Sequence, residues 1–450
     1  LYKNGRLQDV LDKSEQMVLK HTHSFFLYNL RGSANALLKR FDAAINCYKN
    51  AIKVNPNYAA IYNNLGNVFK ETGELELATN NYKQAIKIKP NYSEAYFGLG
   101  LVLEEKEEFL SAIKNYENAL IHKPNYPEVF FNLGNVYRKS GDHKLAIKNY
   151  KNATKLKKDY YKAYCNLGNS KKDLGDVKSA RFYYKKALKI NPNDFETMWN
   201  MHGVSLSLNE AIKWLSECLK AEKSCLKAEL MLSALKYLKN DKFDFNQLRK
   251  TNLKKHPFMR SFIWLFQLEN TPKLFFDKFN LFDYVIQSSI PDRPFYEFGV
   301  WKGVSFKYII KSIKKGFGFD TFTGLPENWY NEKVGTYSNN GIIPKMKGGK
   351  FIEGSFKDSL PKYFSKKRPL ASIINFDADL YSSTLCALEN CKKIIDDRTI
   401  LIFDEFLMSD KWEEDEFKAL NEFCVNNNLS YKVIAVSLFS KQVAVKIVKY

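Results

Sequence analysis

Residues 370–379 read LASIINFDAD, and this stretch decides the fold of the C-terminal half. A short, nearly unbroken apolar run is typical of a strand in a parallel sheet that is covered on both faces. A second run of this form, 399–403, is followed by Asp404 and Glu405. Ligands of open α/β sheets bind outside the carboxyl ends of the strands. Asp377, Asp379 and the second pair are therefore expected at one edge, where their mutual repulsion calls for a hard divalent cation.

The rest of this half alternates between strand and helix patterns. The last two predicted strands are joined by only two residues, so they must be antiparallel. The sequence thus predicts an α/β, Rossmann-like domain with a terminal antiparallel hairpin. The expected strands are 295–300, 316–322, 350–355, 370–376, 399–403, 431–439 and 442–448, and the expected helices are 304–314, 382–396 and 411–427.

A glycine turn follows the first of these strands. It carries Gly299 and Gly303, which let backbone N–H groups and a helix start approach a ligand closely. A dinucleotide fingerprint would have a further glycine where Trp301 stands. Asp320 ends the next strand about 20 residues later, where an acid accepts hydrogen bonds from ribose hydroxyls. The pattern suits S-adenosylmethionine better than NAD.

The N-terminal half repeats itself every 34 residues. Leu-Gly pairs recur, alanine, tyrosine and proline keep the same step, and five full units span 23–192. The marker positions are Leu65, Leu99, Leu133 and Leu167; Ala44, Ala78, Ala112, Ala146 and Ala180; Tyr48, Tyr82, Tyr116, Tyr150 and Tyr184; and Pro56, Pro90, Pro124 and Pro192. Small residues let paired helices cross closely, tyrosine fills the gap between units, and proline ends the second helix.

This pattern resembles the tetratricopeptide repeat (TPR), which implies a superhelix with a concave groove that binds a protein or peptide. Asparagines recur on the first helix of the units, at Asn64, Asn67, Asn132, Asn135, Asn166 and Asn169. They form either an amide ladder for an extended peptide or a tolerated polar helix face.

The repeat register slips after residue 193. We expect a TPR superhelix over 1–226, a helical connector over 227–290 that packs on the second domain, and the α/β domain over 291–450. The aromatic residues of 256–290 fit the connector better than a cofactor box.

The net charge of +21 is unevenly distributed along the chain. Residues 291–450 carry 24 Lys+Arg and 20 Asp+Glu, which leaves +17 on residues 1–290. This excess indicates either a solvated lysine-rich face or an acidic partner, and no RNA-binding signature supports a nucleic acid. The seven cysteines show no CxxC spacing, so we expect reduced thiols, no zinc and a cytoplasmic protein. No apolar run is long enough for a membrane span. The chain begins at Leu1, which leaves an upstream segment open.

Five ordered motifs in the C-terminal half carry a more specific resemblance. They are Glu297-Phe298-Gly299, the stretch 318–327 (GFDTFTGLPE), the stretch 354–361 (GSFKDSLP), the stretch 377–384 (DADLYSST) and the stretch 403–406 (FDEF). Together they resemble the macrocin O-methyltransferase family, class I metal-dependent enzymes that methylate sugar hydroxyls. The resemblance covers about 290–450.

The resemblance implies a role for each motif. Asp377, Asp404 and Glu405 would hold Mg²⁺, although the family usually has aspartate at the position of Glu405, and Asp379 would be the general base. Glu297, Gly299 and Gly303 would face the methionine end of S-adenosylmethionine, Asp320 its ribose, and Gly354, Ser355 and Phe356 its adenine. Asp404 has an alternative role as a helix cap.

These observations predict a S-adenosylmethionine- and Mg²⁺-dependent O-methyltransferase that acts on a hydroxyl of a sugar or glycoconjugate. No histidine follows His256, so a carboxylate must take the proton. Residues 323–348 would form a lid or an insertion. Two alternatives remain: a protein-binding adaptor whose second domain is inactive, and a methyltransferase for a protein or nucleic acid held in the basic groove.

Overall fold

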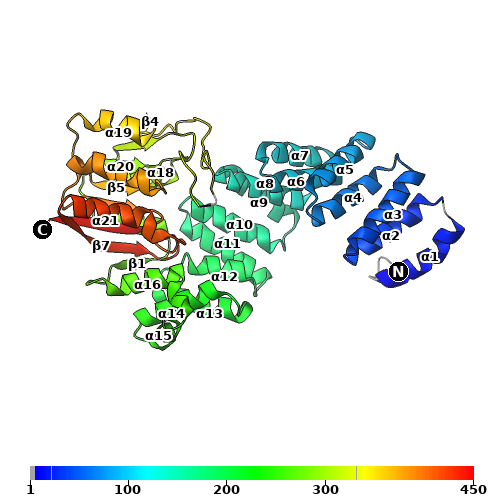
Figure 1. Cartoon of the computed structure of the whole chain (residues 1–450), viewed down its shortest axis with the longest axis horizontal. Coiled ribbons are helices and arrows are strands. Elements are labelled where there is room, and N and C mark those ends of the chain that lie inside the picture. The colour runs from blue at the N-terminus through cyan, green and yellow to red at the C-terminus, as the bar shows by residue number, and fades with distance from the viewer. Residues whose placement is uncertain (1–5, 22, 331, 450) are drawn as a thin grey trace. The chain divides into compact units, whose positions relative to one another are not determined.

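The computed structural model describes residues 6–21, 23–330 and 332–449, and these fall into two compact units divided between Ser170 and Lys171 (Figure 1). Within the described residues, no helix is long and apolar enough to cross a membrane. All seven cysteines are free. Each unit is described separately below.

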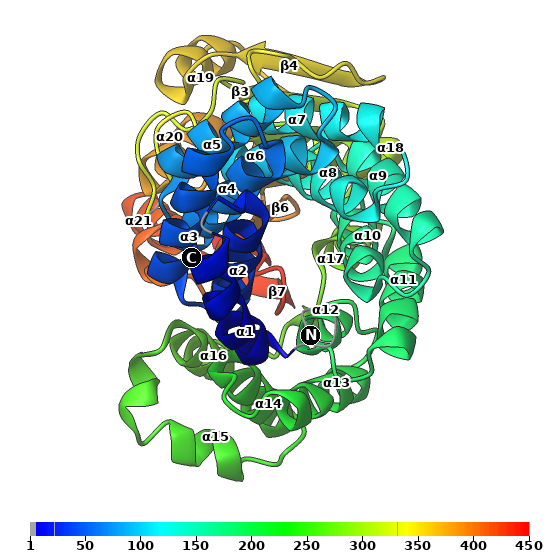
Figure 2. The same ribbon diagram turned by 90° about the vertical axis from the view of Figure 1, so that its right-hand side faces the viewer.

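The first unit consists of antiparallel helix pairs. Its helices are α1 (Leu7–Lys20), α2 (Phe25–Leu37), α3 (Phe41–Val54), α4 (Ala59–Glu71), α5 (Leu75–Ile88), α6 (Ser93–Glu105), α7 (Phe109–His122), α8 (Pro127–Lys139) and α9 (His143–Leu156), and α10 (Tyr161–Asp173) crosses the division. In Figure 2, α6 and α8 lie on the inner side of the curve that the unit follows, and α7 and α9 lie on its outer side.

Tyrosine packing against glycine explains why the helices of a pair approach so closely. The rings of Tyr82, Tyr116 and Tyr150 are fully buried. A Cβ atom added at Gly134 would lie 2.5 Å from the ring of Tyr150, which is too close for any side chain. A Cβ atom added at Gly98 of the following unit would lie 2.4 Å from the ring of Tyr82, so tyrosine also fills the gap between units. The predicted roles of the small and aromatic positions in the repeat are therefore confirmed.

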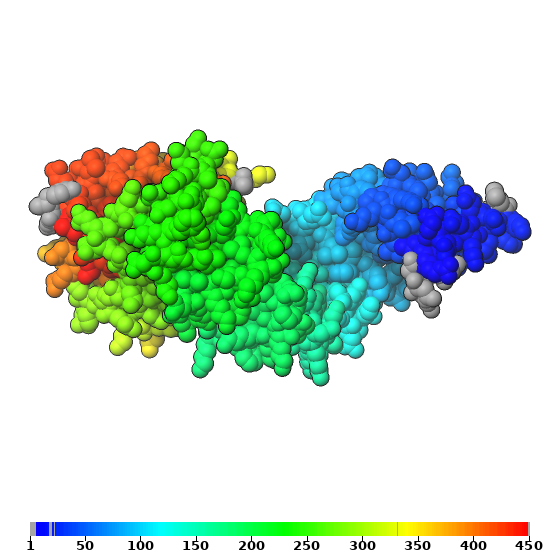
Figure 3. Space-filling model, turned by 90° about the horizontal axis from the view of Figure 1, so that it is seen from below, coloured from blue at the N-terminus to red at the C-terminus, as the bar shows by residue number. Residues whose placement is uncertain are grey.

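The second unit begins with helices that continue the helical half of the chain. These are α11 (Val177–Ile190), α12 (Phe195–His202), α13 (Leu208–Ala221), α14 (Leu226–Leu238), α15 (Phe243–Leu248), the 3₁₀ helix η2 (Asn252–Lys255) and α16 (Pro257–Gln267). In the view of Figure 3 they form the green surface that lies directly against the α/β domain. One apolar core joins α14 and α16 to the sheet.

An eight-stranded sheet forms the centre of the α/β domain, in the order β1-β7-β8-β6-β5-β2-β3-β4. Its strands are β1 (Lys273–Phe275), β2 (Phe295–Phe298), β3 (Gly316–Asp320), β4 (Gly349–Glu353), β5 (Ile373–Phe376), β6 (Ile400–Phe403), β7 (Leu429–Ser437) and β8 (Val443–Lys449). Only β8 is antiparallel, to β6 and to β7. The predicted α/β fold with a terminal antiparallel hairpin is confirmed.

Strand β1 corrects one detail of the sequence analysis. Residues 227–290 were expected to form a purely helical connector, but Lys273–Phe275 pairs in parallel with β7 and forms an edge of the sheet. The helices on either side of it, α16 and α17 (Lys278–Gln287), are present as expected.

Helices cover both faces of the sheet. Alternate residues of each strand point to opposite faces, so Ile374 and Leu401 enter one core while Ile373 and Ile400 enter the other. The first face carries α19 (Phe356–Phe364), α20 (Tyr381–Cys391) and α21 (Glu416–Asn426), and the second carries α17 and α18 (Val304–Ile313). The short 3₁₀ helices η3 (Lys392–Ile394) and η4 (Trp412–Glu414) lie next to α20 and α21.

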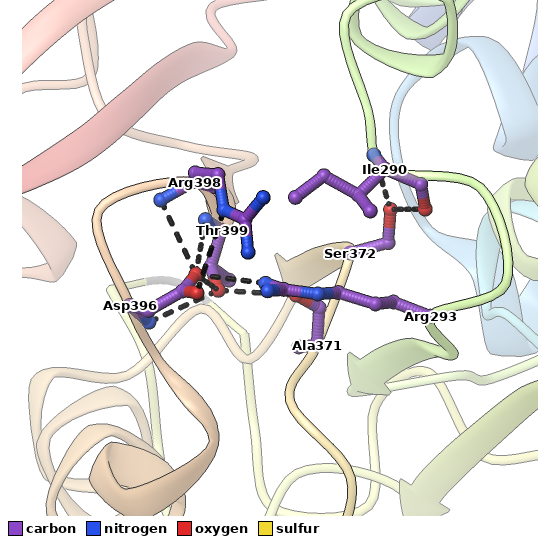
Figure 4. A network of polar contacts seen from close by, with 7 residues as sticks. All are labelled: Ile290, Arg293, Ala371, Ser372, Asp396, Arg398 and Thr399. Atoms are coloured by element: carbon purple, nitrogen blue, oxygen red, sulfur yellow. Dashed lines mark hydrogen bonds and ion pairs between the residues drawn. The ribbon is translucent and has the colours of Figure 1, made fainter.

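A polar network ties together the amino ends of the central strands (Figure 4). Arg293, just before β2, donates to Asp396 at 2.9 Å, and Thr399, just before β6, donates to the same carboxylate at 2.9 Å. Burial acts to raise the pKa of Asp396, but the hydrogen bonds from Arg293 and Thr399 hold it at about 2. This network fixes the edge of the sheet opposite to the predicted site, so it is structural.

Candidate functional site

The acids predicted from the sequence come together at the carboxyl ends of β5 and β6. The two strands are parallel neighbours, and Phe376 is paired with Phe403, so Asp377 and Asp404 leave the sheet side by side. The pKa of Asp377 is raised well above its ordinary value by burial and by the negative charge of Asp404. The negative charge of Asp404 therefore disfavours the ionised form of Asp377.

Asp379, the predicted base, adopts a strained backbone conformation. Its φ of 58° lies in the left-handed region, which a residue with a side chain enters only where its surroundings require it. Burial raises the pKa of Asp379, and the charges of Asp404 and Glu405 raise it further. The carboxylate of Asp379 therefore lies within electrostatic reach of Asp404 and Glu405.

Two neighbouring side chains engage the Asp404–Glu405 pair. The Lys441 Nζ lies 2.7 Å from Glu405 Oε2, and the Gln442 amide donates to Asp404 Oδ1. Burial raises the pKa of Glu405, while the Lys441 charge acts to lower it. Lys441 and Gln442 belong to the turn of the β7–β8 hairpin, which the sequence analysis identified without assigning it a role in the site.

Two further charged groups were also missed from the sequence. Glu416, at the start of α21, is fully buried, accepts the backbone N–H of Glu405 at 3.2 Å and leaves its Oε1 without a hydrogen bond. Lys278, at the start of α17, faces the same acids. Burial acts to lower the pKa of Lys278, but the charges of Asp404 and Asp377 outweigh burial and raise it. Neither residue lies in a motif, so only the folded chain reveals them.

The arrangement has the charge for a cation but not the geometry of a finished metal site. The lysines Lys278 and Lys441 face a larger number of acids. These acids are Glu297, Asp377, Asp379, Asp404, Glu405 and Glu416. Within residues 6–21, 23–330 and 332–449, no three His, Cys, Asp or Glu side chains are placed to hold one metal ion. Glu405 is turned to Lys441, so the predicted ligand set of Asp377, Asp404 and Glu405 is not assembled.

The glycine turn lies directly against the acid edge. Gly299 has a φ of 86°, and a Cβ atom there would lie 1.8 Å from the carbonyl oxygen of Asp377. Only glycine fits this approach. Gly303, with a φ of 69°, is the N-cap residue of α18. The carboxyl ends of β2 and β5, which are parallel neighbours in the sheet, are therefore in contact.

Asp320 braces this turn from the end of β3. Its Oδ2 accepts the backbone N–H groups of Val300 and Trp301 at 2.6 and 2.7 Å, and its Oδ1 accepts that of Phe322 at 2.6 Å. The side chain thus shapes the backbone that would receive the cofactor. Its predicted contact with a ribose stays a prediction.

Glu297 is buried beneath the turn and incompletely paired. The Asn375 amide donates to its Oε1 at 2.8 Å, whereas its Oε2 and the Asn375 Oδ1 have no hydrogen-bond partner. Burial raises the pKa of Glu297 to about 8. Buried polar atoms are nearly always paired in folded proteins, so these two oxygens mark a place for a donor.

The predicted adenine-binding residues follow β4. Gly354 and Ser355 line a pocket of about 380 Å³. Ser355 caps α19 by accepting the backbone N–H of Asp358 at 3.3 Å. The ring of Phe356 packs edge-on against Phe298, 5.8 Å between centroids.

The loop at 323–348, of which residue 331 lies outside the described residues, is held over the glycine turn. The Trp301 indole donates to the Ser338 carbonyl at 3.3 Å, and its ring packs against Tyr337. Burial raises the pKa of Tyr337 to about 12, and the charges of Glu332 and Asp379 add to this effect. The Tyr337 hydroxyl is therefore within electrostatic reach of the predicted base.

The far side of the loop is fastened to the helices that follow the acid strands. Ser382, in the first turn of α20, donates to Glu327 at 2.6 Å, and the Tyr330 hydroxyl donates to Asp415, which precedes α21. The loop thus covers the acid edge from the turn to both helices. Its predicted function as a moving lid stays a prediction.

The asparagines of the first unit form a network of their own. Tyrosine hydroxyls donate to Asn67 at 2.7 Å and to Asn135 at 2.8 Å, and the Asn166 amide donates to Asn135 at 2.9 Å. The Asn64 amide donates to Asn29 of the preceding unit at 3.1 Å. Part of the pattern is therefore structural, because it locks successive units together, which neither alternative in the sequence analysis included.

Comparison with known families assigns the N-terminal part. The family model described as "TPR repeat" matches residues 32–73, 66–107, 105–141 and 134–175, and the model "Tetratricopeptide repeat" matches 161–194. No curated protein matches the chain.

Several solved structures contain similar helical arrays. The Cut9–Hcn1 assembly of APC/C is 19% identical over 52% of this chain and 47% of that chain, with a TM-score of 0.45. The present sequence therefore spans about half of that chain. MamA is 28% identical in sequence, and the match covers 36% of this chain and 94% of the MamA chain, with a TM-score of 0.34. YrrB, described as a TPR protein with an unusual peptide-binding site, is 23% identical in sequence. The match covers 40% of this chain and 95% of the YrrB chain, with a TM-score of 0.35. The N-terminal part of the chain is a tetratricopeptide repeat array, and it is followed by an α/β domain.

Proposed function

We propose that the α/β domain is a S-adenosylmethionine-dependent O-methyltransferase that acts on a hydroxyl of a sugar or glycoconjugate, and that the repeats recruit a protein partner or the carrier of the acceptor. The observation that carries the proposal is the contact between Gly299 and the Asp377 carbonyl. A molecule bound at the glycine turn must lie next to the acid edge. The terminal antiparallel hairpin, which a dehydrogenase sheet lacks, supports the same assignment.

The residues around the turn fit the cofactor. The start of α18 offers backbone N–H groups that no side chain caps, whereas those of Val300 and Trp301 are bound by Asp320. The Oε2 of Glu297 has no hydrogen-bond partner and would accept a donor such as the amino group of the methionine end. Gly354 and Ser355 line the pocket in which the adenine would bind. S-adenosylmethionine supplies an electrophilic methyl group, and the protein must orient an acceptor and remove its proton.

Asp379 is the proposed proton acceptor. Its raised pKa brings the carboxylate closer to the range in which it takes up a proton from a hydroxyl group near neutral pH. Tyr337, on the loop above, would contact the acceptor and exclude water, and the charge of Asp379 already acts on its hydroxyl. The acceptor class itself comes from the family resemblance, in which the acids after β5 and β6 serve sugar hydroxyls.

Mg²⁺ is proposed for the same edge on the strength of charge. Asp377 and Asp404 lie side by side, and hard oxygen ligands with an excess of negative charge suit this cation. When bound, it would orient the oxygens of the acceptor and lower the pKa of its hydroxyl. The third predicted ligand, Glu405, would first have to leave Lys441.

Calorimetric titration of the full chain with S-adenosylhomocysteine tests the proposal. We expect binding, and above the Glu297 pKa of about 8 the Glu297→Gln variant should bind about tenfold more weakly, because an amide cannot accept as the ionised carboxylate does. Glu269→Gln, at an exposed position, serves as the matched control and should bind as the unmodified chain does. Asp320 is a poor test residue, since its loss would collapse the turn. A folded chain that does not bind the probe would refute the enzyme proposal.

One observation favours a second candidate, a TPR adaptor with an inactive α/β domain. Lys441 bonds to Glu405 and Gln442 bonds to Asp404, as expected of a site that no longer binds a ligand. The same titration separates the two candidates, since an adaptor would bind no S-adenosylhomocysteine.

A further inference from the structure

The turn of the β7–β8 hairpin touches the acid site on one side and a helix of the helical half on the other. Strand β8 pairs with β6 so that Val443 lies opposite Phe403. The residue before Val443 and the residue after Phe403 are therefore neighbours, which places Gln442 beside Asp404. This register explains why a turn 36 to 38 residues away in the chain reaches the acids.

The acid side of the turn makes specific polar contacts. Lys441 pairs with Glu405 at 2.7 Å, and the amide of Gln442, which is 2% exposed, donates to Asp404. Both contacts use an acid that the proposed cation would need. Lys441 already donates to Oε2 of Glu405, so a cation would compete with Lys441 for the same oxygen.

The opposite side of the turn is held in an aromatic cage. Ring centroids of Trp199 and His202, both on α12, lie 5.9 and 5.4 Å from that of Phe439. The Lys172 Nζ lies 4.6 Å from the centroid of the same ring. A Cβ atom at Gly203 would come within 2.5 Å of the Phe439 ring, so the ring fills all the space that α12 leaves.

The turn between these two contact regions is closed by hydrogen bonds of its own. The Ser437 N–H donates to the Gln442 carbonyl at 2.8 Å, and the Lys441 N–H donates to the Ser437 carbonyl at 2.9 Å. The hydroxyls of Ser437 and Ser440 are 2.6 Å apart. We therefore expect a displacement of Phe439 to reach Lys441 and Gln442.

We infer that the hairpin turn Leu438–Gln442 is a brace through which α12 holds Asp404 and Glu405 in their paired arrangement. Phe439 is the residue of the turn that packs against α12, and Lys441 and Gln442 are positioning residues for Glu405 and Asp404. Loosening the cage releases the carboxylates and lets them turn to a cation. This consequence rests on the proposed Mg²⁺ site, whereas the brace itself rests only on the contacts above.

Magnesium titration of the full-length protein by calorimetry is the test. Lys441→Met removes the competing charge and should tighten Mg²⁺ binding about tenfold, while Lys441→Arg should leave it unchanged. Phe439→Ala should tighten it in the same direction without touching either acid. Phe439→Tyr keeps a ring in the cage and should restore the affinity of the unmodified chain.

Phe182 offers a matched control. It too carries a lysine over its ring, with the Lys186 Nζ at 5.2 Å, but it is an exposed residue of α11. Phe182→Ala should leave Mg²⁺ affinity unchanged. The inference is wrong if Phe439→Ala binds Mg²⁺ no differently from Phe182→Ala, or if Lys441→Met has no effect while the unmodified chain binds the ion.

Hydrogen–deuterium exchange separates the brace from the proposed function. If no variant binds Mg²⁺, the proposed metal site fails, and the brace is judged from the amides of residues 404–408. Faster exchange there in Phe439→Ala than in Phe182→Ala supports the brace, and equal exchange overturns it. Failure of S-adenosylhomocysteine to bind would refute the methyltransferase proposal alone.

Discussion

At the scale of single residues, Glu297 predicts a pH dependence of stability. Its pKa in the folded chain, about 8, is above the 4.5 of the unfolded chain, because burial disfavours the charged form. Its contribution to stability is therefore full below pH 4.5 and is lost as the pH rises through 8. Glu297→Gln should remove a slope of up to about 1.4 kcal/mol per pH unit between these values.

Urea unfolding monitored by tryptophan fluorescence at pH 5 and pH 8 measures this slope. The gap in unfolding free energy between the two pH values should be smaller in Glu297→Gln than in the unmodified chain. Equal gaps would mean that the unfolded chain and the folded chain hold the proton of Glu297 equally well.

For His202 we expect a pH dependence of stability with the opposite sign. The side chain is fully buried, neither ring nitrogen has a hydrogen-bond partner, and burial lowers the pKa to about 3 from 6.5. The contribution of His202 to stability is full above pH 6.5 and is lost as the pH falls towards 3. In this range the imidazole is protonated in the unfolded chain but stays neutral in the folded chain.

Replacement of His202 by phenylalanine keeps an aromatic ring beside Trp199 and Phe439 but cannot be protonated. We expect the unmodified chain to lose up to about 1.4 kcal/mol per pH unit relative to His202→Phe between pH 6 and pH 4. The measurement is urea unfolding of both proteins at these two pH values. Parallel curves for the two proteins would show that the imidazole is not the titrating group.

At the scale of elements, the stack of repeats depends on tyrosines that pack and donate at once. The hydroxyl of Tyr150 donates to Asn135, and its ring fills the space that Gly134 leaves. Tyr150→Phe should lower the unfolding free energy of the first unit by about 1 kcal/mol, the net contribution of one hydrogen bond. Tyr58→Phe, at a half-exposed ring with a contact to Phe25, should change it by less than about 0.5 kcal/mol.

Circular dichroism during chemical unfolding measures both variants. A loss at Tyr150 no larger than that at Tyr58 would show that the bond to Asn135 contributes nothing beyond packing.

The elements also show which features a sequence can reveal. Repeats with a fixed step, buried strands such as 373–376 and the final hairpin follow from local pattern, and their bounds came within a few residues. Strand β1 was missed because three residues carry no periodicity, and its partner β7 lies more than 150 residues away. Gly299 was predictable from its motif, but its approach to the Asp377 carbonyl was not, because that depends on two strands meeting.

The residues of the candidate site likewise fall into those that a local pattern predicts and those that only tertiary packing brings in. Asp377, Asp379 and Asp404 were predictable, since each follows an apolar strand whose end must lie at the ligand-binding edge. Lys278, Glu416 and Gln442 lie on elements that reach the acids only through tertiary packing. The role of Asp320 was only partly foreseen, because its three backbone bonds exist only once the turn has formed.

At the scale of the whole molecule, the two compact units carry different optical reporters. All six tryptophans, at positions 199, 214, 264, 301, 329 and 412, lie in the second unit, whereas the helices of both units contribute to far-UV circular dichroism. Repeat arrays gain stability mainly from neighbouring units, so a defect at the N-terminal end is expected to remain local.

Tyr48→Ala tests this independence. Tyr48 is buried against Gly32 in the first unit, and its truncation should cost about 3 kcal/mol. We expect the early part of the circular dichroism transition to shift to lower urea while the tryptophan transition stays in place. Phe262→Ala, at a buried ring of α16, should do the reverse and move the tryptophan transition. If Tyr48→Ala moved both transitions equally, the chain would instead unfold as a single cooperative body.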